Sequence, residues 1–152
     1  VTNKKSVFHP EAYQLQEPLS PHFAAKKEAI EINMSSIQLP KTNNTILIEG
    51  AGGILVPLND SNNVIELAKQ FECEIVIVIR NYLGCINHSL LTLEYLENNG
   101  YNLKGLVLNG DFEEEVLEPI LKVANTKVLL SIPDKMDVNK ATIIHYSKQV
   151  NW

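Results

Sequence analysis

A carboxylate followed at once by a glycine-rich loop is the strongest chemical signal in this chain. The apolar run at residues 46–48 ends at Glu49, and Gly50, Gly52 and Gly53 fall within the next four residues. Glycine lets a backbone approach a ligand closely and point N–H groups at an anion. Magnesium prefers hard oxygen ligands, so Glu49 is a candidate metal ligand. The alternatives are a tight turn after a core strand and a carboxylate that caps the loop's own amides.

A second loop combines an amide side chain with the start of a helical pattern. The β-branched run at 74–79 leads through Arg80 into the sequence LGCINH at 83–88. Free N–H groups at a helix N-terminus attract anions, so the backbone at Ile86 and the amide of Asn87 could form an anion site. Cys85 fits a small packing residue better than a nucleophile, and we expect His88 to be a cap or a surface residue.

Alternating apolar patterns predict the elements that position these loops. Strands are expected at 45–48, 74–79, 103–109 and 127–132, and helices at 22–33, 60–70, 86–98, 115–125 and 139–149. This order predicts an α/β fold, a doubly wound parallel sheet with helices on both faces. We expect a left-handed cap at Asn99-Gly100 and an interruption of the fourth helix at Pro119. The interpretation is a single domain over 1–152.

Composition excludes several classes of protein. The 152 residues carry a net charge of −5 and form no basic stripe, which argues against nucleic-acid binding. No apolar run approaches the length of a membrane span. Cys73 and Cys85 form no C-x-x-C pair, and reduced thiols in a cytoplasm are the simple interpretation.

Five short motifs together resemble one enzyme family. They are SPH at 20–22, EGAGG at 49–53, LGCINH at 83–88, LN at 108–109 and IP at 132–133, in that order along the chain. This combination resembles the dethiobiotin synthetases, P-loop-type ligases that close the ureido ring on the way to biotin. LGCINH is the most specific of the five, whereas related P-loop ligases and amidotransferase-coupled synthetases carry loops similar to EGAGG.

The resemblance implies a role for each matching residue. Glu49 would bind Mg²⁺, and the nucleotide site would comprise Glu49, Gly50, Ala51, Gly52, Asn109, Gly110, Ile132, Pro133 and Asp134. The substrate site would comprise Gly52, Leu83, Gly84, Cys85, Ile86 and Asn87, which grip a carboxylate across a two-fold dimer. Turn formation by the Asn109-Gly110 dipeptide is the alternative to base recognition at Asn109.

The resemblance also implies the reaction and its partners. It is the ATP- and CO₂-dependent closure of 7,8-diaminononanoate (diaminopelargonate) to dethiobiotin, with Mg²⁺ and a cytoplasmic homodimer, and without nucleic acid or membrane. The family's GxxxxGK loop, completed by Ser or Thr, has no match among the 152 residues. We therefore interpret the chain as the C-terminal three-quarters of such an enzyme, inactive and unstable alone, without catalytic lysines. A related amidoligase and a non-catalytic dimerisation or binding module remain alternatives.

Overall fold

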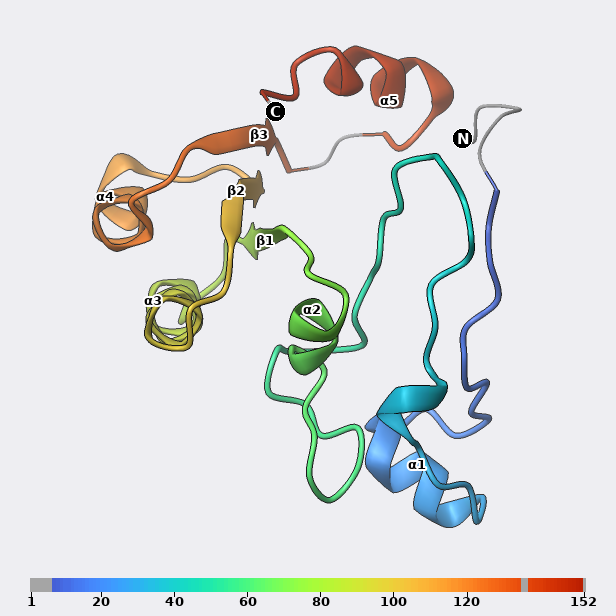
Figure 1. Ribbon diagram of the computed structural model, residues 1–152. Coiled ribbons are helices and arrows are strands. Elements are labelled where there is room, and N and C mark those ends of the chain that lie inside the picture. The colour runs from blue at the N-terminus through green and yellow to red at the C-terminus, as the bar shows by residue number, and fades with distance from the viewer. Residues whose placement is uncertain (1–6, 135–136, 152) are drawn as a thin grey trace. The chain divides into compact units, whose positions relative to one another are not determined.

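The computed structural model describes residues 7–134 and 137–151, and the chain forms two compact units (Figure 1). The loop-rich unit runs to Cys73, and the sheet unit begins at Glu74. The loop-rich unit contains α1 (Pro21–Lys27), the 3₁₀ helix η1 (Met34–Ser36) and α2 (Glu66–Gln70). The sheet unit contains β1 (Ile75–Arg80), α3 (Cys85–Asn98), β2 (Leu103–Asn109), α4 (Glu114–Ala124), β3 (Val128–Ile132) and α5 (Lys140–Ser147).

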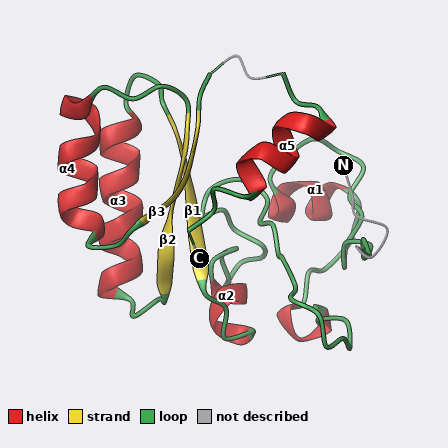
Figure 2. Cartoon of the chain, turned by 90° about the horizontal axis from the view of Figure 1, so that it is seen from above, coloured by secondary structure: helices red, strands yellow, loops and turns green. Residues whose placement is uncertain are grey.

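Three parallel strands in the order β1-β2-β3 form the sheet. Each strand is rich in Val, Ile and Leu, which pack well on a pleated surface. Val78 pairs with Val107, and Val107 pairs with Leu130; the register shifts once in each pairing, after Ile75 in β1 and after Leu106 in β2. Figure 2 shows α3 and α4 on one face of the sheet and α5 on the other side. The predicted α/β fold with a parallel sheet is confirmed.

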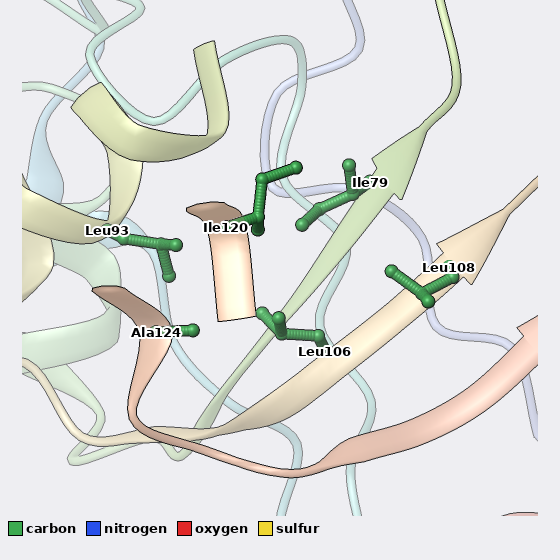
Figure 3. Packing of buried hydrophobic residues seen from close by; sticks show 6 residues of the cluster. All are labelled: Ile79, Leu93, Leu106, Leu108, Ile120 and Ala124. Atoms are coloured by element: carbon green, nitrogen blue, oxygen red, sulfur yellow. The ribbon is translucent and has the colours of Figure 1, made fainter. Parts of the chain in front are cut away.

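Buried side chains between this sheet and the helix pair α3–α4 form the larger core. Its buried members are Ile79, Leu93, Leu106, Leu108, Ile120 and Ala124 (Figure 3). Leu106 and Ile120 are completely buried. Burying an aliphatic side chain of this size contributes about 1.5–3 kcal/mol, so this cluster holds the strands and the helices at fixed separations.

The ends of the helices in the sheet unit follow the sequence signals, with one exception. Gly100 has φ +66° and its N–H donates to the Glu97 carbonyl at 3.0 Å, which is the predicted left-handed cap after α3. Pro119, however, lies inside a continuous α4, so the predicted interruption is wrong. A proline inside a helix removes one intrahelical hydrogen bond, and its ring crowds the carbonyl four residues earlier. Burial of Ile120, which packs with Leu106 and Leu108 of β2, favours the helix at this point.

Side-chain hydrogen bonds organise much of the loop-rich unit. Its core consists of Ala25, Ile32 and Leu58. The Asn59 side chain donates to the Ile32 carbonyl at 2.9 Å and accepts from the Ser61 N–H, also at 2.9 Å. One amide therefore fixes both the loop that contains it and a segment 27 residues earlier.

Near α2, a carboxylate serves a similar purpose. The Asn63 N–H and the Asn62 side-chain amide donate to the Glu66 carboxylate at 2.8 and 2.9 Å. These two bonds favour the charged form and lower the pKa of Glu66 below its ordinary value.

Several predicted elements in this unit are wrong. Residues 45–48 form no strand and Leu47 is 92% exposed, because no strand of the described residues pairs with this segment. The helix expected at 60–70 begins only at Glu66, since the side chain of Asn59 holds the preceding residues in a turn. The helix expected at 22–33 ends at Lys27, shortly before Ala29 adopts φ +54°.

Among the described residues, no helix is both long and apolar enough to cross a membrane.

Candidate functional site at the carboxyl edge of the sheet

The loops that follow β1, β2 and β3 meet at one edge of the sheet because the strands are parallel. Backbone pairing continues past the strand ends. The Asn81 N–H donates to the Asn109 carbonyl at 3.1 Å, and the Gly110 N–H donates to the Ile132 carbonyl at 2.8 Å. The carboxyl edge of an open parallel sheet is where α/β proteins bind their ligands. Three of the predicted nucleotide-site residues, Asn109, Gly110 and Ile132, are thus direct neighbours.

Gly110 is the point where the three loops converge. Its φ of +120° belongs to a region that residues with a Cβ rarely adopt. A Cβ added there would lie 3.2 Å from the Cβ of Asn81 and 3.4 Å from Oδ1 of Asp134. The chain therefore needs glycine at this position both for its backbone conformation and for the close approach of its neighbours.

A cavity of about 280 Å³ opens beside Gly110. It is lined by Leu108, Gly110, Asp111, Phe112, Leu117, Ser131 and Pro133. Gly110 and Pro133 are predicted site residues, whereas Asn109, Ile132 and Asp134 are neighbours of the cavity in sequence but do not line it. Sequence reasoning missed Phe112 and Leu117. An aromatic residue two positions after a strand-ending Asn-Gly was the available signal for Phe112.

The loop between β1 and α3 carries the predicted substrate residues. Gly84, with φ +101°, is the N-cap of α3, and Cys85 is buried as the first helical residue. Leu83 is fully exposed, Ile86 is half-buried and Asn87 is exposed. The N–H of Cys85 donates to the Tyr82 carbonyl at 3.0 Å, and the exposed loop therefore ends in a tight turn.

A side-chain pair closes this loop. The Tyr82 hydroxyl is hydrogen-bonded to Nδ1 of His88, and their ring centroids lie 5.8 Å apart. His88 is exposed, as predicted for a surface residue. Burial of Cys85 agrees with the packing role expected of it.

Partial burial raises the pKa of the Cys73 thiol, which disfavours a reactive thiolate there.

The glycine-rich loop belongs to the loop-rich unit. Glu49, Gly50, Ala51, Gly52 and Gly53 are all exposed. Gly52 has φ +78°, and the Val56 N–H donates to the Gly53 carbonyl at 3.1 Å, which forms a turn. The described part of the chain contains no group of three or more His, Cys, Asp and Glu side chains arranged to hold a metal ion. Glu49 would therefore hold a cation only together with oxygen ligands from elsewhere.

The parallel α/β sheet with its packed helices is consistent with a fold of the P-loop NTPase type. A family model described as an AAA domain matches residues 1–142. The chain is 45% identical to the ATP-dependent dethiobiotin synthetase BioD of Cytophaga hutchinsonii over 150 residues. This aligned region covers 97% of the chain and 73% of that protein. The chain belongs to the dethiobiotin synthetase family, as its motifs predict.

Two further relatives are also ATP-dependent dethiobiotin synthetases. The ATP-dependent dethiobiotin synthetase BioD of Lawsonia intracellularis is 38% identical over 138 residues, which cover 91% of the chain and 68% of that protein. The corresponding protein of Christiangramia forsetii is 35% identical over 149 residues, covering 98% of the chain and 72% of that protein. Similarity at this level extends along almost the whole chain, through both compact units.

Proposed function

We propose that this protein is a dethiobiotin synthase of biotin biosynthesis. It would convert 7,8-diaminononanoate, CO₂ and ATP to dethiobiotin, ADP and phosphate. The observation that carries the proposal is the 45% identity to an ATP-dependent dethiobiotin synthetase over 97% of the chain. The convergence of the loops after β1, β2 and β3 beside a cavity supports it independently, because ring closure needs two ligands held next to one another.

The chemistry divides into three steps. One amine of the substrate adds to CO₂ and loses a proton to give a carbamate. A carbamate oxygen attacks the γ-phosphorus of ATP and ADP leaves. The second amine then attacks the carbon of this mixed anhydride, phosphate leaves, and the five-membered urea closes. No protein nucleophile takes part, so positioning and charge stabilisation account for the catalysis.

We assign the adenine side of ATP to the cavity beside Gly110. Phe112 offers an aromatic face for a planar base, and Leu108 and Leu117 supply apolar walls. Asn109, Ile132, Pro133 and Asp134 would contribute the rim, with the amide of Asn109 able to both donate to and accept from a base edge. The volume of about 280 Å³ suits a base but not a whole nucleotide, so the phosphates would extend beyond it.

We assign the substrate carboxylate to the start of α3. Ile86 and Asn87 are in the first turn, where backbone N–H groups have no intrahelical partner. The exposed amide of Asn87 adds a further donor, and the fully exposed Leu83 can cover the alkyl chain. Gly84 and Cys85 shape this turn, and a homodimer would bring it to the site of a second subunit.

Glu49 and the glycine loop would serve the phosphates. Glu49 fits a magnesium ligand because it is an exposed carboxylate in a loop whose glycines leave the backbone accessible. Gly50, Ala51 and Gly52 would direct N–H groups at the nucleotide. Magnesium held there would neutralise charge on the transferred phosphoryl group.

We further propose that both units belong to one domain and that the enzyme is cytoplasmic.

Phosphate release by the full-length protein tests this function. Release should require ATP and bicarbonate and should be stimulated by diaminononanoate. Glu49→Ala should lower kcat/KM by roughly 100-fold through the loss of a charge-stabilising group. Glu31→Ala, at another exposed glutamate of the same unit, is the matched control and should retain activity. Absence of stimulation by diaminononanoate would refute the function, and full activity of Glu49→Ala would refute the role of Glu49 alone.

A further inference from the structure

Asn81 is bonded to both of the loops to which the proposed function assigns ligands. Its backbone N–H donates to the Asn109 carbonyl at 3.1 Å, and its side-chain amide donates to the Asp111 carbonyl. On the other side, the Cys85 thiol lies 3.9 Å from Asn81 Oδ1 and points toward it as a weak donor. One asparagine thus contacts the loop after β2 and the first residue of α3.

The position of Asn81 is also fixed by packing. The Cβ of Asn81 lies 3.2 Å from where a Cβ of Gly110 would be, so the two residues are in close contact across neighbouring loops. Asn81 is half-buried and is not among the residues that line the cavity. Its side-chain amide is hydrogen-bonded to Asp111 and Cys85, one in each neighbouring loop, so its influence on the site acts through these two residues.

We propose that Asn81 is a positioning residue that couples the substrate loop at 83–87 to the nucleotide cavity. Asp111 lines that cavity, and Cys85 begins the helix whose first turn would hold the substrate carboxylate. Because Asn81 bonds to both, a shift of either loop is transmitted to the other. The inference rests on the proposed function, which assigns one ligand to each loop.

The coupling has a measurable form. Each ligand stabilises its own loop, and through Asn81 it also stabilises the loop that binds the other ligand. Coupling free energies are reciprocal, so ATP and diaminononanoate should each tighten the binding of the other by the same factor. Loss of the Asn81 side chain should weaken both sites and bring that factor toward one.

Two substitutions separate the bonds that Asn81 makes. Asn81→Ala removes every side-chain bond. Asn81→Asp keeps the Oδ1 acceptor that faces Cys85 but replaces the donor to the Asp111 carbonyl with an oxygen. In the full-length protein we expect each variant to raise KM for both ATP and diaminononanoate by roughly fivefold, the cost of one lost hydrogen bond. The decrease in kcat should be smaller than either increase in KM.

Asn99→Ala is the matched control. The Asn99 side chain also donates to a backbone carbonyl, that of Tyr95 at 2.8 Å, but at the other end of α3. This variant should show a comparable decrease in melting temperature while both KM values stay unchanged. A purely structural role of Asn81 would likewise lower only the melting temperature.

The outcomes distinguish the two proposals. Wild-type ring closure with both KM values unchanged in Asn81→Ala and Asn81→Asp, or with only one of them raised, would overturn the coupling and leave the proposed function intact. Failure of both variants to fold would also overturn it, because Asn81 would then be a folding determinant. Absence of ring closure in the wild type would refute the proposed function, and the coupling with it.

Discussion

The two compact units of this chain hold their functional loops in different ways. In the sheet unit, backbone pairing between parallel strands continues into the loops, as at Gly110, whose N–H donates to the Ile132 carbonyl. In the loop-rich unit, single side chains hold distant segments together. Asn59 donates to Ile32, and the Gln70 amide donates to the carbonyl of Met34 at 3.2 Å. Repetitive backbone pairing tolerates substitution, whereas a fold held by individual side chains depends on each of them.

The sharpest test of this difference compares the two cores. Leu106 is completely buried in the larger core, and Leu58 is 8% exposed in the smaller one. Leu106→Ala should reduce the free energy of unfolding by about 4 kcal/mol and Leu58→Ala by about 2 kcal/mol, because a tightly enclosed cavity collapses less. Urea unfolding of the full-length protein measures both values. Equal losses would mean that the two cores are equally well packed.

A second test compares two glycines. Gly110→Ala should cost about 2 kcal/mol, since its φ is +120° and a Cβ there would lie 3.2 Å from Asn81 Cβ. Gly53→Ala is the matched change in the loop-rich unit, where a Cβ meets nothing within 4 Å and φ is not in the left-handed region. That change should stay within about 0.5 kcal/mol. Thermal unfolding monitored by circular dichroism measures the pair, and a neutral Gly110→Ala would contradict the close approach.

The smallest expected effect concerns helix caps. The Asn139 side chain accepts from the Ala141 and Thr142 N–H groups at 2.9 and 3.1 Å, in a capping box that begins α5. Asn139→Ala should cost about 1 kcal/mol. Ser20 is the N-cap of α1, but its side chain makes no capping bond, so Ser20→Ala should change stability by at most a few tenths of a kcal/mol. Amide exchange of each helix reports the effect, and a larger loss for Ser20→Ala would reverse the expected order.

Sequence patterns predicted the sheet unit well for a physical reason. A run such as residues 103–109 is both apolar and flanked by matching runs, and β2 has these same bounds because two strands pair with it. Residues 45–48 have an equally apolar sequence but no partner strand among the described residues. Periodicity reports how a segment can be buried, and it does not report whether a partner is present.

The candidate site was only partly predictable. Gly110 and Pro133 line the cavity, and their motifs were visible in the sequence. No sequence pattern indicated Asn81, because its proposed role depends on a hydrogen bond to Asp111, 30 residues later in the chain. Phe112 lies between β2 and α4, and its place two positions after Asn109-Gly110 was a weak signal until the fold showed that it lines the cavity.

The hydrogen bonds donated by Asn81 and Gly110 have a consequence for adaptability. The backbone N–H groups of Asn81 and Gly110 both donate to carbonyls of the neighbouring strand ends. The backbone at this edge of the sheet therefore cannot bend without breaking these hydrogen bonds. In the proposed site, adjustment to ligands of different size would therefore fall to side chains, such as Phe112 in the cavity and the exposed Leu83 in the neighbouring loop. In the proposed site, a backbone fixed by these hydrogen bonds would favour selection of ligands by their shape over selection by loop closure.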